Sequence, residues 1–340
     1  MGSAHSMRAA VFDRPGRPLD IVARPVPEPG ERQVLLKVGR CGICGSDLHL
    51  TEPESCRLAS GSIIGHEISG EVVALGSGVT RIKVGDHVAA LPITGCGSCP
   101  ECFQGEPAWC RRGRQVLAGG YAQYALAGER ECLVLPLGLS FADGALVEPL
   151  AVALHGVRMA PDLRGAKVLV LGVGPIGLAA VFWARRLGAA KVGAIDGNQS
   201  RIELAMALGA SFSQSPEEAA DAVAAFAPDI VFECVGRPGL LADAIEAVRP
   251  RGTVVSLGFC MVPEQIMASA AAVREVTLIF PVLYSIEDFQ LTIDALEAGH
   301  VEARTMITDT ITLDQLPAIF EELRRPSGRC KVMIDPWAGE

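Results

Sequence analysis

The sequence predicts an α/β protein in which a doubly wound parallel sheet is joined to a β-rich domain. From about Val152 to Tyr284, apolar strands alternate with alanine-rich helical stretches, a rhythm that builds a parallel sheet covered by helices on both faces. From Met7 to about Glu131, strand-length runs are divided by Gly and Pro, which is typical of an all-β segment with long loops. The 340 residues suffice for about two domains.

The apolar runs also predict the individual elements. In the β-rich part we expect strands at residues 8–13, 33–38, 71–75 and 87–91. In the alternating part we expect strands at 167–171, 191–196, 230–234 and 253–257, with helices near 176–187, 200–208 and 239–248. After Ser285 the pattern predicts two amphipathic helices and a last strand at 331–334 that returns to the first domain.

The change of pattern sets the expected domain boundaries. The β-rich domain is expected at residues 7–151 and again at 285–340, and the alternating domain at 152–284. Residues 1–6 lack the basic end and apolar core of a secretion signal, so we interpret them as a cloning remnant.

Composition and charge exclude several classes of partner. The formal net charge of −9 disfavours nucleic acid and anionic membrane surfaces. The longest uncharged stretch, residues 168–184, is short for a membrane span and contains helix-breaking Gly and Pro, so we expect no span. Eleven cysteines without a secretion signal favour metal ligation over disulfides, and hence a cytoplasmic protein.

Four of these cysteines form a tight cluster with the spacing C-x2-C-x2-C-x7-C, in a loop rich in Gly and Pro. The cluster comprises Cys96, Cys99, Cys102 and Cys110. Four thiolates suit tetrahedral zinc and leave no open position, so this zinc would fold the loop and take no part in catalysis. Two alternatives stay open on spacing alone: neighbouring reduced thiols and an iron–sulfur cluster.

The stretch VLVLGVGPIG is an apolar strand that runs directly into a GxGxxG turn and then into a helix, the arrangement that binds a dinucleotide pyrophosphate in a Rossmann fold. The expected phosphate-binding residues are Gly172, Gly174, Pro175, Ile176 and Gly177. The alternative is a glycine-rich turn with no ligand.

Further cofactor contacts are expected at the ends of the neighbouring strands. Asp196 can accept hydrogen bonds from both ribose hydroxyls and would repel a 2′-phosphate, which favours NAD over NADP. Arg201 is a weak signal in the opposite direction, because an arginine can accommodate that phosphate, although a solvated charge is the commoner role. The nicotinamide half is expected near Val235, Gly236, Leu257 and Gly258.

A second set of possible metal ligands lies in the β-rich part. Cys44 in CGICGSDLH, with His66 and Glu67 in GHE, offers a thiolate, an imidazole and a carboxylate. Each of these residues taken singly has an ordinary structural explanation, so spacing alone does not establish this site.

These motifs together resemble a known family. CGICGSDLH, GHE, the four-cysteine loop, VEPLAVALH and the GxGxxG strand occur in the order found in the zinc-dependent medium-chain dehydrogenases of the alcohol dehydrogenase superfamily. The resemblance covers nearly the whole chain after Met7 and implies a GroES-like catalytic domain beside the Rossmann domain. It is strongest for the sorbitol, threonine and polyol dehydrogenase branch, because Glu148 stands where many alcohol dehydrogenases carry a second cysteine ligand.

The resemblance implies the ligands of a catalytic zinc, which would be the second zinc of the chain. Cys44 and His66 are then the firm ligands, Glu67 is a direct or alternating ligand, and Glu148 binds directly or through water. The remaining coordination position is left for water or substrate.

The resemblance also implies a proton path and an activity. Ser46 would take the proton of the substrate hydroxyl and His49 would pass it towards solvent, with Glu148 sharing this role in the polyol branch. The implied reaction moves a hydride between NAD(H) and a secondary alcohol or polyol and its ketone, in a homodimer or homotetramer. Two alternatives remain: a zinc-stabilised nucleotide-sensing protein without turnover, and an NADPH-linked enoyl or quinone reductase of the same superfamily.

Overall fold

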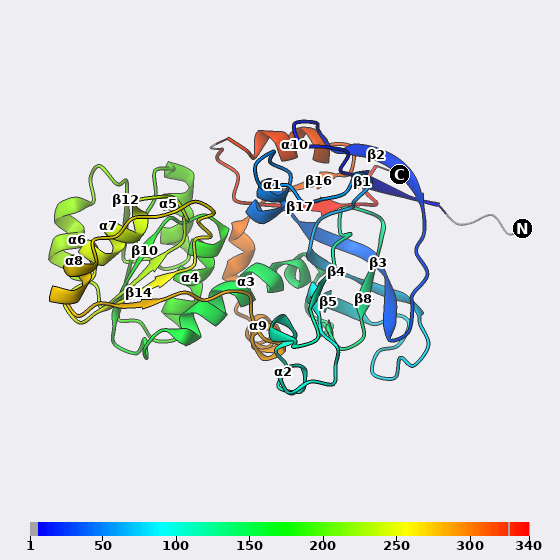
Figure 1. Cartoon of the computed structure of the whole chain (residues 1–340), viewed down its shortest axis with the longest axis horizontal. Coiled ribbons are helices and arrows are strands. Elements are labelled where there is room, and N and C mark those ends of the chain that lie inside the picture. Colours follow the sequence, from blue (N-terminus) through cyan, green and yellow to red (C-terminus); the bar gives the residue numbers. More distant parts are fainter. Residues whose placement is uncertain (1–5, 326, 340) are drawn as a thin grey trace, which may run out of the picture. The chain divides into compact units, whose positions relative to one another are not determined.

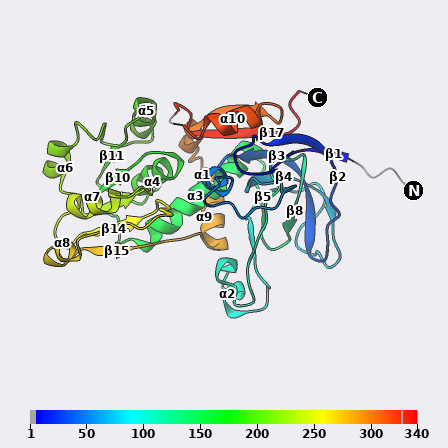
Figure 2. The same cartoon turned by 45° about the horizontal axis from the view of Figure 1, so that its top comes forward.

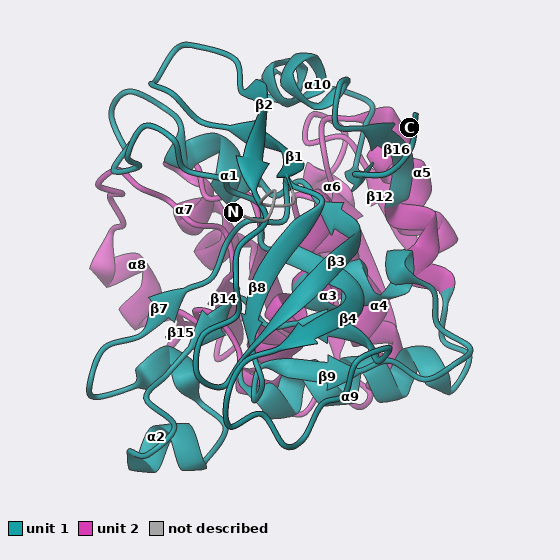
Figure 3. Cartoon of the chain, turned by 90° about the vertical axis from the view of Figure 1, so that its right-hand side faces the viewer, with its two compact units in different colours: residues 1–148, 285–301, 307–340 teal, residues 149–284, 302–306 magenta. Residues whose placement is uncertain are grey.

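The computed structural model describes residues 6–325 and 327–339 (Figure 1). Residues 1–5, which belong to the predicted cloning remnant, lie outside the described residues, while Ser6 already begins the first strand. The chain divides into two compact units (Figure 3). Unit 1 contains residues 1–148, 285–301 and 307–340, and unit 2 contains residues 149–284 and 302–306.

Unit 2 contains a six-stranded parallel sheet with the order β12-β11-β10-β13-β14-β15. Its strands are β10 (Lys167–Leu171), β11 (Lys191–Ile195), β12 (Phe212–Gln214), β13 (Ile230–Glu233), β14 (Thr253–Ser256) and β15 (Thr277–Ile279). Its helices are α4 (Pro175–Arg186), α5 (Gln199–Ala207), α6 (Ala220–Phe226), α7 (Leu240–Ala247), α8 (Ala268–Val273) and the 3-10 helix η2 (Glu302–Met306). The predicted doubly wound parallel sheet is confirmed.

The strand order of this sheet reverses between β10 and β13. The chain first proceeds outward through β11 and β12, and then returns to build β13, β14 and β15 on the other side of β10. Val168, Leu169 and Val170 are fully buried in succession, because a central parallel strand has no solvent-facing side. Ligands of such sheets bind at the carboxyl ends of the strands where the order reverses, so this edge is where a cofactor is expected.

Unit 1 is built on a seven-stranded sheet with the order β16-β17-β3-β4-β5-β9, in which β8 also pairs with β3. These strands are β3 (Gln33–Gly42), β4 (Glu67–Leu75), β5 (His87–Ala90), β8 (Tyr124–Gly128), β9 (Cys132–Val134), β16 (Ile307–Thr312) and β17 (Lys331–Asp335). Two small hairpin sheets pair β1 (Ser6–Val11) with β2 (Asp20–Pro25), and β6 (Ile93–Thr94) with β7 (Gln115–Val116).

Most helices of unit 1 are short. The unit contains α1 (Gly45–Leu50), α2 (Pro100–Phe103), the 3-10 helix η1 (Pro107–Trp109), α9 (Ile286–Glu297) and α10 (Leu316–Glu322). The longest helix, α3 (Phe141–Met159), contains the boundary between the two units and is not among the predicted helices. Its start carries a signal that could have revealed it, since Ser140 and Asp143 exchange capping hydrogen bonds of 2.7–3.2 Å.

The C-terminal strand β17 lies beside β3, although the two are far apart in the sequence (Figure 2). They pair antiparallel, with Met333 opposite Gly42 and Ile334 opposite Cys41. This pairing brings the last part of the chain next to the strand that leads into Cys44.

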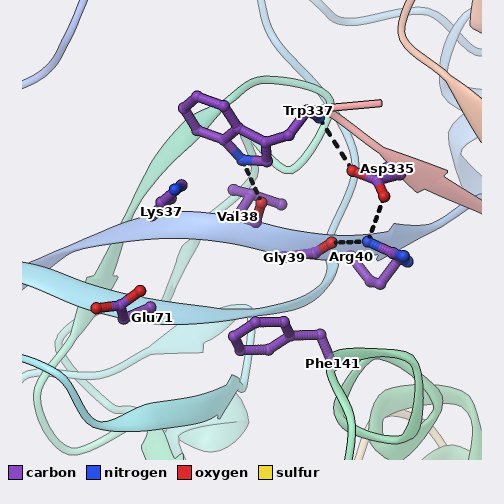
Figure 4. Close-up of a pocket in the computed structure, with 8 residues that line it drawn as sticks. All are labelled: Lys37, Val38, Gly39, Arg40, Glu71, Phe141, Asp335 and Trp337. Carbon is purple, nitrogen blue, oxygen red and sulfur yellow. Dashed lines mark hydrogen bonds and ion pairs between the residues drawn. The ribbon is translucent and has the colours of Figure 1, made fainter. Parts of the chain in front are cut away.

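The end of β17 and the residues that follow it are bound to β3 around a hollow of about 260 Å³ (Figure 4). The Trp337 indole donates to the Val38 carbonyl at 2.9 Å, Arg40 pairs with Asp335 at 2.8 Å, and the Lys37 ammonium lies 4.5 Å from the Trp337 ring. The described residues that line this hollow include none of the predicted metal or cofactor ligands. Its contacts therefore serve to hold the C-terminal segment on the sheet.

Within the described part of the chain, no helix combines the length and apolar character needed to cross a bilayer.

Candidate functional site

The pairing of β3 with β4 brings together three predicted ligands. Cys44 caps α1 just after β3, and Glu67 begins β4, where it pairs with Gly42. The Cys44 sulfur, a His66 ring nitrogen and a Glu67 carboxylate oxygen all lie within 4.8 Å of one another. A Cβ at Gly42 would lie 1.8 Å from a Glu67 oxygen, so the absence of a side chain there gives the carboxylate its space.

A buried carboxylate, Asp47 on α1, orients the imidazole of this group. Asp47 contacts Nδ1 of His66 at 3.1 Å, and it accepts hydrogen bonds from the Tyr121 hydroxyl at 2.6 Å and the Cys44 amide at 3.3 Å. Burial opposes ionisation of Asp47, but His66 and these hydrogen bonds outweigh it, so the pKa of Asp47 lies below its usual value. With Nδ1 engaged, Nε2 of His66 is the nitrogen available to a metal.

Glu67 forms a buried ion pair with Lys331 of β17. The Lys331 Nζ lies 2.5 and 2.7 Å from the two Glu67 oxygens and donates to the Ile43 carbonyl at 3.0 Å, and both side chains are at most 1% exposed. Burial lowers the pKa of Lys331, but the Glu67 carboxylate more than offsets this and raises it. Lys331 therefore stays charged and neutralises Glu67.

The other residues predicted for this site lie at different distances from it. Glu148, on α3, is 6% exposed and falls outside the three groups that lie within 4.8 Å of one another. The Ser46 hydroxyl lies 3.3 Å from the Cys44 sulfur, directly beside the ligand group. The ring of His49, one turn further along α1, contacts Glu52 at 3.3 Å.

Sequence reasoning missed Asp47, Tyr121 and Lys331. Asp47 and Tyr121 carry no signal of their own, because their roles come from contacts across the fold. A lysine at the head of the otherwise apolar run KVMI was the one available hint of a buried charge at Lys331.

The four cysteines of the second cluster also converge. Their sulfurs all lie within 4.8 Å of one another, with Cys99 3.4 Å from Cys102 and 4.0 Å from Cys110. Zinc–thiolate bonds of about 2.3 Å in a tetrahedron separate the sulfurs by about 3.8 Å. An iron–sulfur cluster divides its four thiolates among two or four irons and spreads the sulfurs further apart. The observed spacing thus fits a single tetrahedral ion.

The glycine turn between β10 and α4 forms one side of a hollow of about 560 Å³ in unit 2. Gly172 adopts a φ of 82°, and a Cβ at Gly177 would lie 1.9 Å from the Gly172 carbonyl oxygen. A Cβ at Gly174 would meet only the end of the Arg201 side chain, at 3.9 Å. Gly172 is therefore required by its backbone conformation and Gly177 by close packing, while Gly174 leaves open space. Pro175 and Ile176 form the first turn of α4.

Asp196 and Arg201 both line this hollow. One Asp196 oxygen accepts from the Val173 amide and the other from the Asn198 amide, each at 2.8 Å, and Arg201 lies 4.0 Å from the carboxylate. The Arg201 side chain is 28% exposed, so it turns into the hollow and does not extend freely into solvent.

The residues predicted for the nicotinamide half are held together by Glu233, which is 2% exposed. Its Oε1 accepts from the Val235 and Gly236 amides at 2.7 and 2.8 Å, and its carbonyl oxygen accepts from Leu257 and Gly258 at 2.7 and 2.8 Å. Val235 lines the hollow, whereas the hollow's described lining does not include Gly236, Leu257 or Gly258.

Comparison with known proteins relates this combination of sites to a family. The Alcohol dehydrogenase GroES-like domain matches residues 30–137, and the Zinc-binding dehydrogenase family matches residues 175–298. Sorbitol dehydrogenase of Gallus gallus is 33% identical, over 96% of this chain and 95% of its own. The chain belongs to the zinc-dependent medium-chain dehydrogenases.

Solved structures of this dehydrogenase family share the whole fold. The 2R,3R-butanediol dehydrogenase of Bacillus subtilis is 30% identical, with a TM-score of 0.88 and coverage of 97% of this chain and 100% of that chain. A structure from Sinorhizobium meliloti, bound to NADP, is 31% identical, with a TM-score of 0.89 and coverage of 98% and 100%. The predicted GroES-like and Rossmann folds are confirmed. The prediction that the protein is an alcohol or polyol oxidoreductase is confirmed as well.

The side chains of this dehydrogenase fit the two groups that its family uses, zinc and a nicotinamide dinucleotide. A thiolate, an imidazole and a carboxylate within 4.8 Å of one another form a donor set that zinc prefers. In unit 2, the open space at Gly174 lies at the start of α4, where backbone amides face an incoming phosphate.

We predict that Lys331→Met destabilises the protein by about 3–5 kcal/mol, because it leaves the buried Glu67 carboxylate without its partner. Urea unfolding should show this loss, and the double variant Glu67→Gln/Lys331→Met should recover much of it. Arg164→Met breaks an ion pair whose arginine is 81% exposed, and it should cost less than about 1 kcal/mol. Equal losses for the two single variants would contradict the assignment.

Proposed function

We propose that this dehydrogenase oxidises a secondary alcohol or polyol to its ketone with NAD, and catalyses the reverse reduction. The observation that carries the proposal is the close grouping of Cys44, His66 and Glu67 in a chain that also carries a GxGxxG turn followed by Asp196. Relatives named for sorbitol and for 2R,3R-butanediol support this class of substrate, since both compounds carry secondary hydroxyl groups.

Cys44 and His66 would hold the catalytic zinc, with Glu67 as a direct or alternating ligand. Glu148, buried on α3, would act from outside this group or through water. When bound, zinc supplies Lewis acidity that lowers the pKa of a substrate hydroxyl. Asp47 keeps the His66 ring in one orientation, and Lys331 limits the negative charge at Glu67.

Ser46 and His49 would carry the proton away from the substrate. Ser46 is suited to accept it first, because its hydroxyl lies 3.3 Å from the Cys44 sulfur. His49 shares α1 with Ser46, and its ring is oriented by a contact with the Glu52 carboxylate at 3.3 Å.

We further propose that NAD is the preferred cofactor. When bound, NAD would supply the hydride acceptor for the reaction. The Asp196 carboxylate would bind the ribose hydroxyls and repel a 2′-phosphate. Gly172, Gly174 and Gly177 would lie against the pyrophosphate. Arg201 beside Asp196, and the NADP bound to the Sinorhizobium meliloti structure, favour some use of NADP as well.

The four-cysteine cluster would hold a second, structural zinc. Short 3-10 and helical turns and a two-stranded hairpin surround it, with little apolar content, so metal binding would contribute to local folding. Such thiolates must stay reduced to bind the metal, which supports a cytoplasmic location.

We predict that the purified enzyme forms NADH from a panel of secondary alcohols and polyols, which absorbance at 340 nm measures. Cys44→Ser should lower both the zinc content and turnover, the latter by more than about 100-fold. Cys260→Ser, a half-buried thiol outside both clusters, is the control and should leave both unchanged. Full turnover by the Cys44→Ser protein would remove the zinc assignment, and no NADH from the wild type would remove the function.

Asp196→Ala should raise KM for NAD and reduce the preference for NAD over NADP by about 10- to 100-fold, the value of one or two hydrogen bonds to a charged acceptor. Steady-state kinetics with both cofactors measures this ratio. Glu203→Ala, an exposed carboxylate on the following helix, serves as the control. An unchanged ratio in the Asp196→Ala enzyme would show that its carboxylate does not face the ribose.

We also propose that the enzyme is a homodimer or a homotetramer that assembles through β15. This strand is an edge of the unit 2 sheet, and the adjoining Phe280 and Val282 are 62% and 39% exposed. Sedimentation equilibrium should give a mass of two or four chains of 35.7 kDa, and Phe280→Asp should shift it towards the monomer. A wild-type monomer at micromolar concentration would exclude this assembly.

A further inference from the structure

Arg324, just after α10, binds the last turn of α1. Its guanidinium donates to the Leu48 carbonyl at 3.0 Å and to the Thr51 hydroxyl at 2.7 Å. The Thr51 hydroxyl donates in turn to the Leu48 carbonyl at 2.8 Å. The Leu48 carbonyl also accepts from the Thr51 amide at 3.2 Å, so Arg324 and the Thr51 hydroxyl add two further donors to the last turn of α1.

The guanidinium is itself held in place by α10. The Glu321 carboxylate accepts two hydrogen bonds from the guanidinium, at 2.8 and 3.2 Å. The central carbon of the guanidinium lies 5.3 Å from the Phe320 ring centre. Only 23% of the Arg324 side chain is exposed. A paired, stacked and half-buried arginine keeps a fixed geometry, unlike a surface arginine held by one contact.

A second chain of contacts joins α10 to α1. Phe320, fully buried, meets the Tyr121 ring edge-on at 6.2 Å, and the Tyr121 hydroxyl donates to Asp47. Asp47 belongs to α1 and holds His66. The C-terminal segment therefore reaches α1 in two ways. Arg324 binds the last turn of α1, and Phe320 packs against Tyr121, which binds the buried Asp47 carboxylate.

From these contacts we infer that Arg324 is a positioning residue for α1 and, through it, for the metal site and the proton path. Helix α1 has six residues, too few to be stable alone, yet it carries Ser46, Asp47 and His49. Its placement must come from tertiary contacts, and Arg324 provides the contact at its C-terminal end. The inference rests on the proposed function for its effect on turnover, but not for its effect on metal retention.

The test compares Arg324→Ala and Arg324→Lys with Arg329→Ala. Arg329 lies on the same C-terminal segment and pairs with Asp309 and Glu322, without contacting α1. Two experiments are made: one measures the rate at which zinc passes to a colorimetric chelator, and the other measures kcat and KM for NAD and for the best alcohol of the panel.

We expect Arg324→Ala to release the zinc of the Cys44 site about tenfold faster and to lower kcat about tenfold, with KM for NAD within about twofold of the wild type. A lysine can replace one of the two hydrogen bonds that Arg324 donates to α1. Arg324→Lys should therefore give values between those of the wild type and Arg324→Ala. Arg329→Ala should match the wild type in both measurements, although its thermal stability can fall.

Thr51→Val removes the hydroxyl that Arg324 binds and is the milder second variant. Combined with Arg324→Ala, it should add little to the single effect, because both changes break the same contact. Wild-type zinc release and kcat in Arg324→Ala, or equal changes in Arg329→Ala, would overturn the inference. If no variant and no wild-type enzyme reduces NAD, the proposed function fails, while faster zinc release in Arg324→Ala alone still supports the positioning role.

Discussion

The pairing of β3 with β4 is the constraint on which the candidate metal site of unit 1 depends. It places Glu67 opposite Gly42, and the chain reaches Cys44 two residues beyond that point. A register shift of one residue would turn Glu67 to the other face of the sheet, away from Cys44 and Lys331. Gly42 contributes because any larger residue would occupy the space of the carboxylate. Backbone hydrogen bonds thus position residues that the sequence separates.

Around this pairing the fold buries more charge than a protein interior normally accepts. Asp47, Glu67 and Lys331 are each at most 1% exposed, and each has charged or hydrogen-bonding partners. With the His66 imidazole neutral, as a metal ligand must be, the two carboxylates exceed the single lysine by one negative charge. A divalent cation neutralises such an excess, so the electrostatics of the buried groups and the donor set favour the same occupant.

The cofactor site of unit 2 depends on close approaches between backbone segments. Gly172 and Gly177 let α4 start against the end of β10. A Cβ at Gly258 would lie 2.1 Å from the Gly236 amide nitrogen, and Glu233 binds amides on both of these turns. The ends of β13 and β14 are therefore tied to each other, which would give the nicotinamide half of the proposed cofactor site a rigid wall.

The sequence by itself determined the parallel sheet, the glycine turn and the four-cysteine cluster, since each of these is encoded by neighbouring residues. The four predicted strands, β10, β11, β13 and β14, match the observed bounds within one residue, whereas the short strands β12 and β15 were not predicted. The cysteine spacing already indicated a metal. The tertiary structure alone decided which buried groups support the ligands around Cys44. Lys331 and Glu67 are 264 positions apart, and Tyr121 and Asp47 are 74 apart. Such contacts depend on sheet register and on the return of β17 to β3, and no local pattern in the sequence specifies either.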